Sequence, residues 1–390
     1  INIIIPLDDI EEPKYITVGN NTYKWYGNGE LSVIGELTTD SGMTSEENSN
    51  INGVQELNIK EIAKGTDMAF DNNVQKEQNI AKVNGVKKIY VHSGTIYIID
   101  ANDKLWAWGA NEYNKLGQGN SYLVTEPTNI QEKTEILKDA KVKNVWAGPT
   151  NTFILDEENR LWAAGANANG VLGQGNTNSY NNFVEVKIDG LDNSTIEEIY
   201  LTSINNLQYS SAIIKCSNGK VYAGGHNRYG GFGIGTTSFV SKFIELSKEN
   251  EIWSKAKIIY NQGIISYVIT EDGELYGAGY NADGQLGLGH TNTRVTTLTK
   301  IADNVKNISH LTEVDMVFIK NDGFIYKPDS NGNIKKLDGI ESTDIQFISN
   351  IIVVSNNKMY QISSSGTISP YYHDYSVEEY MYFGGNTIGF

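Results

Sequence analysis

The sequence predicts an all-β protein folded as a closed ring of seven four-stranded sheets, a β-propeller. Three observations support this prediction: an aromatic strand ending in glycine recurs along the chain, a β-hairpin accompanies each copy, and copies repeat at a spacing of about 50 residues. A period of this size is typical of propellers and solenoids. The chain's 390 residues, of which 39% are hydrophobic, can bury a large core.

The most regular feature is a pair of glycines. The segments LWAWG, LWAAG, VYAGG and LYGAG each end in glycine, and a second glycine follows eight positions later. The pairs are Gly109 and Gly117, Gly165 and Gly173, Gly225 and Gly233, Gly279 and Gly287, with an earlier pair at Gly27 and Gly35. Segments 324–329 and 358–363 keep the aromatic residue without these glycines. Glycine adopts backbone angles that other residues avoid, so we expect it to end the strand and open the return turn.

Each copy predicts four antiparallel strands. Two runs rich in β-branched and aromatic residues flank a short turn, as in TFILDEENRLWAAG. Another strand segment precedes the hairpin and a fourth follows the glycine loop, as in VKNVWAG and NFVEVKI. The hairpins that predict seven blades lie at 15–27, 95–109, 152–165, 211–225, 266–279, 316–329 and 351–363. Segment 59–82 leaves eight blades as the alternative, because it fits either a compressed blade or part of an insertion.

Positions within the repeated strand predict different surroundings. Side chains alternate between the two faces of a sheet, so the aromatic at the second position, such as Trp162, can fill the wedge between blades. The third position is often small, as expected where the next blade lies close. The fourth position varies, with Tyr26 and Trp108 in two copies and Ala or Gly elsewhere. We interpret this variation as a sign of an exposed position.

The two ends of the chain predict how the ring closes. The tail VEEYMYFGGNTIGF resembles the first strand of a repeat, while the chain starts at a hairpin. We therefore expect the C-terminal strand to pair with the N-terminal blade, which leaves few exposed sheet edges. Residues 1–390 then form a single domain, and the Ser-, Thr- and Asn-rich segment 36–58 forms an exposed insertion loop.

Composition narrows the possible functions. The net charge of −16 argues against binding to nucleic acid or to anionic membranes. No run of eighteen apolar residues occurs, so we expect no membrane insertion. The first residues, INIIIPLDDIEEPKY, lack the basic head and long apolar stretch of a secretory signal, so we expect none in this chain. Only three residues are arginine while lysine, asparagine and isoleucine abound, a bias that fits a low-GC bacterium.

Catalytic and metal-binding patterns are not found. The five histidines are scattered and none stands at metal-ligand spacing, and the single cysteine, Cys216, lies in a predicted strand as a buried thiol. Acidic pairs such as Glu157-Glu158 and Glu271-Asp272 fall in predicted hairpin turns. We therefore expect neither catalytic residues, nor a cofactor, nor a metal. Two acids facing each other across a central pocket would restore an enzyme hypothesis.

The repeat, read as W/Y-x-x-G-x-N-x-x-G-x-L-G-x-G, resembles that of the regulator of chromosome condensation family. It appears here as LWAAGANANGVLGQG and LYGAGYNADGQLGLG, most clearly over residues 86–300. The resemblance implies a seven-bladed propeller. Bacterial members of that family inhibit β-lactamase by covering its active site, and eukaryotic members exchange nucleotides on a small GTPase. These two roles are alternatives to a general protein-interaction module.

Binding to another protein is the function that remains. A propeller presents variable loops on rigid sheets, and aromatic and arginine side chains on such loops make strong anchors. We expect a monomer that is exported or on the bacterial surface and binds its partner through one face. By this reasoning we expect eight residues to be exposed and to be candidates for partner binding: Tyr26, Trp108, Tyr113, His226, Arg228, Tyr229, Tyr280 and Asp283.

Overall fold

The structure is a computed structural model that describes residues 14–18, 21–25, 31–36, 86–92, 94–119, 122–191, 194–202, 207–311, 315–339, 345–349, 352–355, 358–363, 365–370, 380–383 and 386–389. Regular structure in these ranges is almost entirely β, which confirms the predicted fold class. The exceptions in these ranges are α2 (Leu246–Glu249) and the 3-10 helices η1 (Glu112–Asn114), η2 (Gln131–Lys133), η3 (Glu135–Leu137), η4 (Leu207–Tyr209) and η5 (Glu251–Lys255).

Six sheets of the described chain have four antiparallel strands in sequence order. They are β4 (Val86–His92), β5 (Thr95–Asp100), β6 (Leu105–Gly109), β7 (Val124–Asn129); β8 (Val142–Ala147), β9 (Asn151–Asp156), β10 (Leu161–Gly165), β11 (Tyr180–Val186); β12 (Ile196–Leu201), β13 (Ser211–Cys216), β14 (Val221–Gly225), β15 (Val240–Glu245); β16 (Ala256–Asn261), β17 (Ile265–Thr270), β18 (Leu275–Tyr280), β19 (Arg294–Ala302); β20 (Val305–His310), β21 (Met316–Lys320), β22 (Ile325–Pro328), β23 (Ile334–Lys336); β24 (Ile345–Ser349), β25 (Ile352–Ser355), β26 (Lys358–Ile362), β27 (Ile368–Pro370). A three-stranded sheet contains β1 (Lys14–Val18), β2 (Asn21–Trp25) and β3 (Leu31–Glu36), and a two-stranded one contains β28 (Tyr380–Phe383) and β29 (Asn386–Gly389).

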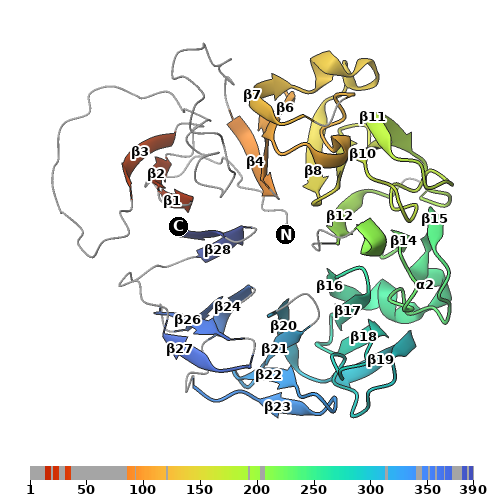
Figure 1. Cartoon of the computed structure of the whole chain (residues 1–390), viewed down its shortest axis with the longest axis vertical. Helices are drawn as coiled ribbons and strands as arrows, with labels where there is room; N and C mark the ends of the chain where they lie inside the picture. The colour runs from red at the N-terminus through yellow and green to blue at the C-terminus, as the bar shows by residue number, and fades with distance from the viewer. Residues whose placement is uncertain are drawn as a thin grey trace.

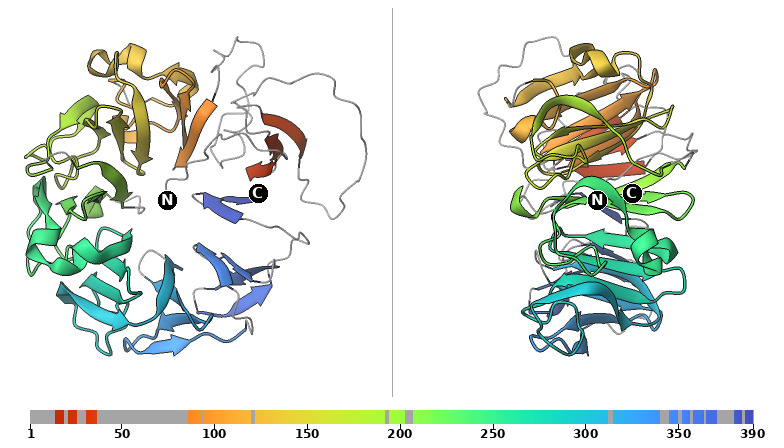
Figure 2. Two further views of the ribbon diagram at one scale, coloured as in Figure 1. Left: turned by 180° about the vertical axis from the view of Figure 1, so that it is seen from behind. Right: turned by 90° about the vertical axis from the view of Figure 1, so that its right-hand side faces the viewer.

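The sheets follow one another around a ring, from β4 to β27 (Figure 1). The first strand of each four-stranded sheet lies nearest the centre, and the fourth lies toward the rim. Seen from the side, the ring is a disc (Figure 2). This is the propeller arrangement that the repeat predicts.

The N-terminal and C-terminal strands lie in the same sector of the ring. β29 lies beside β1 and pairs antiparallel with β28 (Figure 1). Among the described strands, no hydrogen-bonded ladder joins these two sheets, so closure by pairing of the chain ends stays a prediction. The blade count and the single domain also stay predictions. Segment 59–82 and the predicted insertion 36–58, apart from Glu36 in β3, lie outside the described residues.

Buried layers between neighbouring sheets hold the ring together. Trp162, at the second position of β10, lies in one layer with Tyr97 and Ile99 of the preceding sheet. Tyr222, the equivalent residue of β14, lies in the next layer with Phe153. The role of these aromatics as wedges between blades is therefore confirmed. The same position is partly buried against later layers at Tyr276, Tyr326 and Tyr360.

The backbone requires both paired glycines of this repeat, the one that ends β10 and the one in the loop after it. Gly165 has a φ of +108°, and a Cβ added there would lie 2.4 Å from the Thr150 carbonyl oxygen. Gly173 has a φ of +69°, and its added Cβ would lie 2.3 Å from the Phe243 ring. Any other side chain would meet both a strained backbone angle and a steric clash. The architectural interpretation of the repeat is therefore confirmed at these positions.

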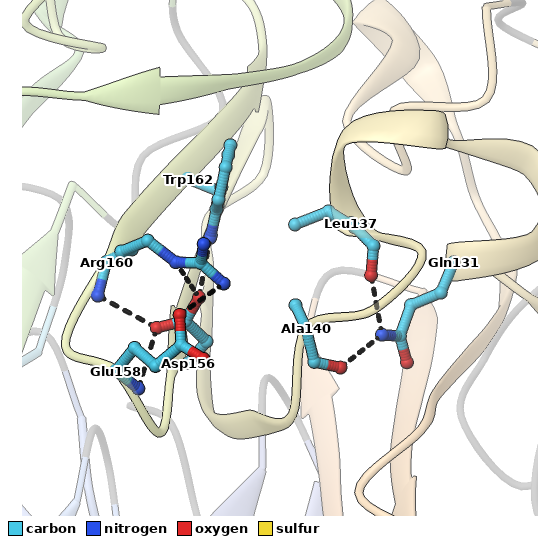
Figure 3. Close-up of polar contacts among 7 residues, drawn as sticks. All are labelled: Gln131, Leu137, Ala140, Asp156, Glu158, Arg160 and Trp162. Carbon is cyan, nitrogen blue, oxygen red and sulfur yellow. Dashed lines mark hydrogen bonds and ion pairs between the residues drawn. The ribbon is translucent and has the colours of Figure 1, made fainter.

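A buried carboxylate organises the β9–β10 hairpin turn (Figure 3). Asp156 Oδ1 accepts hydrogen bonds from the backbone N–H groups of Glu158 at 3.0 Å and Arg160 at 2.8 Å. Asp156 Oδ2 accepts from Arg160 Nε at 2.7 Å and from Trp162 Nε1 at 3.3 Å. One side chain thus satisfies the turn backbone and fixes the wedge tryptophan. This acid has a structural role, as the turn chemistry predicts.

Other polar and reactive residues also lie where the sequence predicts. Glu157 and Glu158 lie in the β9–β10 turn, and Glu271 and Asp272 lie in the β17–β18 turn. Cys216 is buried in β13, and burial raises the pKa of its thiol to about 12. Its thiol is therefore protonated at neutral pH, as expected of a core residue. Gln131 crosslinks the region after β7 by donating to the carbonyls of Leu137 and Ala140 (Figure 3).

Candidate protein-binding face

The glycine-paired loops all emerge on one side of the disc. Neighbouring strands are antiparallel, so the connections from first to second strand and from third to fourth strand leave each sheet at the same end. The hairpin turns between second and third strands lie at the opposite end. The side that carries the longer connections, such as 226–239 between β14 and β15, is called the loop face below.

A buried asparagine fixes the shape of each of these loops. Asn227 Oδ1 accepts from the Phe232 N–H at 3.0 Å, and its Nδ2 donates to the Thr236 carbonyl at 3.0 Å. Asn281 accepts from Leu286 N–H at 2.9 Å in the same way. Sequence reasoning assigned no role to this residue. Its signal was nevertheless present, because asparagine stands two positions after the closing glycine in four copies, at Asn111, Asn167, Asn227 and Asn281.

Aromatic rings from two neighbouring blades form a continuous surface on the loop face. Tyr229 of the β14–β15 loop meets Tyr280 at the end of β18, with ring centroids 5.2 Å apart and nearly perpendicular. His226 contacts Tyr229 at 5.9 Å, Phe239 at 5.6 Å and Tyr209 of η4 at 5.3 Å. We call this set, completed by two arginines, the aromatic–arginine patch: Tyr209, His226, Arg228, Tyr229, Phe239, Tyr280 and Arg294.

The two arginines lie against rings of the patch. The Arg228 guanidinium carbon is 5.8 Å from the Phe239 ring centroid, and that of Arg294 is 5.6 Å from the Tyr229 centroid. Arg228 and Arg294 are exposed, and Phe239 retains 50% of its accessible surface. The surface formed by an exposed phenylalanine and nearby guanidinium groups is both apolar and positively charged. This combination suits recognition of another macromolecule.

His226 supports the patch from beneath, which corrects the expectation that it is exposed. Its side chain keeps 1% of its accessible surface, and its Nδ1 lies 2.9 Å from the Gly263 carbonyl oxygen. Burial lowers the pKa of His226, and the nearby positive charge of Arg228 acts in the same direction. The first position after the closing glycine points into the loop, so the ring carries its neighbours instead of reaching solvent.

The patch ends at an acidic residue next to a pocket. Burial raises the pKa of the Tyr280 hydroxyl, and the neighbouring Asp283 carboxylate adds to this effect. Gln285 Nε2 donates to Asp283 Oδ2 at 3.0 Å. Beyond Asp283 lies a pocket of about 390 Å³, whose charged lining residues are Asp283, Asp315, Lys327, Asp329 and Lys335. The face therefore changes from cationic and aromatic at Arg228 to mixed charge at this pocket.

The remaining sequence candidates that the structure describes lie apart from the patch. Trp108 is fully buried, so its predicted exposure was wrong. The fourth strand position points the same way as the second, and Ala164 accordingly shares the buried layer of Trp162. Its variation therefore reflects packing size and not exposure. Tyr113 is 41% exposed but belongs to η1, two blades from the patch, and Tyr26 lies outside the described residues.

Polar contacts also join the inner strands of successive sheets. Trp146 Nε1 of β8 donates to Glu198 Oε1 of β12 at 2.6 Å, and burial raises the pKa of Glu198 to about 7. Lys88 of β4 donates to Asn144 Oδ1 of β8 at 2.8 Å. Each of these hydrogen bonds joins a donor on one blade to an acceptor on the next blade. We interpret them as links of the ring, which sequence reasoning did not identify.

The described residues contain no group of three or more His, Cys, Asp or Glu side chains placed to hold a metal ion. None of the helices in the same ranges has the length and apolar character that crossing a bilayer requires. The expectations that the chain has no catalytic residues and no cofactor stay predictions.

Sequence comparisons identify relatives that contain the same repeat. The family described as regulator of chromosome condensation (RCC1) repeat matches residues 102–155. Human E3 ubiquitin-protein ligase HERC2 is 28% identical over 218 residues, which cover 55% of this chain and 4% of that protein. An RCC1 repeat-containing protein of Dictyostelium discoideum is 27% identical over 237 residues, covering 58% of this chain and 45% of that one. The chain thus spans less than half the length of these relatives.

Solved structures share the architecture at low sequence identity. Human WBSCR16 superposes with a TM-score of 0.58 at 13% identity, covering 76% of this chain and 84% of that one. Yeast RCC1 (Prp20), in its complex with Kap60, superposes with a TM-score of 0.56 at 16% identity, covering 78% and 80%. The paired glycines, the ring of four-stranded sheets and these matches lead to one conclusion: this chain contains a segment that matches the RCC1 repeat and has the β-propeller fold.

Proposed function

We propose that this chain is a non-enzymatic protein-interaction module that binds a partner protein through the aromatic–arginine patch on its loop face. The observation that carries the proposal is the patch itself, a run of ring contacts from Tyr209 to Tyr280 with an exposed Phe239. Tyrosine and arginine are enriched at the energetic centres of protein interfaces. An RCC1-like propeller fits such a role because it holds variable loops on a rigid ring.

The placement of the sequence candidates supports this site. His226, Arg228, Tyr229 and Tyr280 belong to the patch, and Asp283 lies at its edge. They come from two different blades, so the fold assembles a surface that neither blade carries alone. We also propose that the partner is met at the surface or exterior of a low-GC bacterial cell, on the composition of the chain.

The test is a selection for binders to the full-length protein. Random peptides displayed on phage are selected against the immobilised chain, and the affinities of recovered peptides are measured by fluorescence anisotropy. We expect the double variant Tyr229→Ala/Phe239→Ala to weaken most of these peptides at least tenfold, because aromatic hot spots contribute about 2 kcal/mol or more each.

The matched control is Tyr122→Ala, a more exposed aromatic outside the patch, at 79% of its accessible surface. It should change the affinities less than about twofold. Thermal unfolding of every variant checks that the ring is intact. Peptides that bind the patch variant as tightly as the parent protein, or that are lost with Tyr122→Ala instead, would contradict the proposal.

A further inference from the structure

The three arginines of this chain have very different surroundings. Arg160 is paired, with its Nε 2.7 Å from Asp156 Oδ2 and its NH2 2.8 Å from Glu158 Oε2. Arg228 and Arg294 have no carboxylate within ion-pair distance among the described residues, and each lies against an aromatic ring of the patch. Arg160 is exposed but paired, whereas the two arginines of the loop face have no carboxylate partner among the described residues.

This arrangement is unexpected in so acidic a chain. Its 47 aspartate and glutamate residues outnumber its 31 lysines and arginines, so carboxylates are plentiful. A guanidinium carries its N–H groups at the edge of its plane, where they can bind a carboxylate with two parallel hydrogen bonds. The contact of each guanidinium with a ring also limits the movement of the side chain, so less conformational entropy is lost on binding.

We infer that the aromatic–arginine patch takes an acidic segment of the partner protein. Carboxylates of that segment pair with Arg228 and Arg294, while an apolar side chain beside them packs on Phe239 and Tyr229. The inference rests on the proposed function and deepens it by stating the chemistry of the partner.

Asp283 limits where the acidic residues can lie. Its carboxylate is held at the far edge of the patch by Gln285, on the Tyr280 side. A carboxylate of the partner placed there would meet a like charge. The acidic end of the segment is therefore directed toward Arg228 and Arg294. The surface thus favours one orientation of the bound segment as well as a negative charge.

The same peptide selection tests this inference with different variants. Peptides recovered on the parent protein should be enriched in aspartate and glutamate next to an apolar residue. The double variant Arg228→Gln/Arg294→Gln should weaken them about tenfold or more, since hydrogen bonds between charged groups are the strong ones. Arg228→Lys/Arg294→Lys should recover only part of this loss, because lysine keeps the charge but lacks the planar fork.

The charge-matched control is Lys138→Gln/Lys257→Gln, which removes two positive charges from exposed positions outside the patch. It should change affinity less than about twofold. Raising the salt concentration from about 50 mM to about 500 mM should weaken binding to the parent protein more than to the Arg→Gln variant.

The outcomes separate the two proposals. Peptides that are lost with Tyr229→Ala/Phe239→Ala but carry no excess of acid, or are unaffected by Arg228→Gln/Arg294→Gln, would overturn the acidic partner and leave the binding patch standing. Enrichment of basic peptides would overturn it as well. Binding that ignores all patch variants would overturn both proposals.

Discussion

Two loops of the ring have the same backbone skeleton but present different side chains. The loop after β10 and the loop after β14 share their paired glycines and their buried asparagine, Asn167 and Asn227. Asn167 accepts from Leu172 N–H at 2.8 Å, and Asn227 accepts from Phe232 N–H at 3.0 Å. The side chains around these shared residues differ.

The differing positions decide what each loop presents. Where one loop has the buried Ala166, the other has the His226 ring, and where one has Ala168, the other has Arg228. Asn169 donates to backbone carbonyls of Leu207 and Gln208, whereas the equivalent Tyr229 offers its ring to the patch. The comparison teaches that a repeated loop skeleton can carry either small residues or a cluster of aromatic and arginine side chains.

The largest expected effect comes from breaking the skeleton. Gly165→Ala should lower the free energy of unfolding by about 4 kcal/mol, from positive-φ strain and overpacking together. Its Cβ would lie 2.4 Å from a backbone oxygen that cannot move aside. Urea unfolding followed by tryptophan fluorescence measures the change.

Gly175→Ala is the control, because its φ is +74° but nothing lies within 4 Å of an added Cβ. It should cost about 1 kcal/mol, the strain of the backbone angle alone. Equal losses for the two variants would show that space around Gly165 is not the limiting factor.

A smaller effect is expected from the shared asparagines. Asn167→Ala and Asn227→Ala should each lower the free energy of unfolding by about 3 kcal/mol, because each leaves buried backbone groups without partners. The two losses should agree within about 0.5 kcal/mol if the skeletons are equivalent. Losses that differ by more than about 1.5 kcal/mol, measured by the same urea titration, would show that the two asparagines do not stabilise their loops equally.

The smallest effect concerns the histidine that distinguishes the two loops. Burial lowers the pKa of His226 below that of an unfolded histidine, about 6.5. The unfolded state therefore binds more protons as the pH falls below 6.5, and this residue makes the protein less stable in acid. His226→Ala, which copies Ala166, should reduce the loss of stability between about pH 8 and about pH 5.

His310 contributes with the same sign, since burial lowers its pKa to about 4, so part of the acid sensitivity should remain in the variant. The melting temperature at each pH gives the slope directly. A slope unchanged by His226→Ala would mean that the ring beneath the patch does not become protonated on unfolding.

The repeated strands and glycine loops could be predicted from the sequence, but the burial of the fourth position of the repeated strand could not. Period, hairpins and glycines follow from short-range rules, so the strands at 95–109 and 152–165 were found from local pattern alone. Trp108 was misplaced because variation from Trp to Ala was interpreted as exposure, whereas alternation puts that position in a buried layer. Sequence variation alone does not distinguish an exposed position from a buried position whose available space differs between blades.

The aromatic–arginine patch was predicted only in part, because its residues lie far apart along the chain. His226, Arg228 and Tyr229 are neighbours in sequence, so their loop was recognisable. Tyr209 was missed because it joins the same surface from the connection between β12 and β13. Phe239 was missed because it lies at the far end of the loop that begins with His226, and Arg294 enters from the start of β19. The pairing of exposed rings across two blades depends on the curvature of the ring, which no local pattern encodes.

Asn227 anchors its loop to the loop's own backbone, and not to the side chains at 228, 229 or 239. Arg228 and Phe239 are exposed, so we expect that these two positions can be varied together while the chain still folds. This propeller could serve as a scaffold for displaying variable loops. Selection would change the binding specificity of one loop at a time, and the unchanged loops would serve as controls.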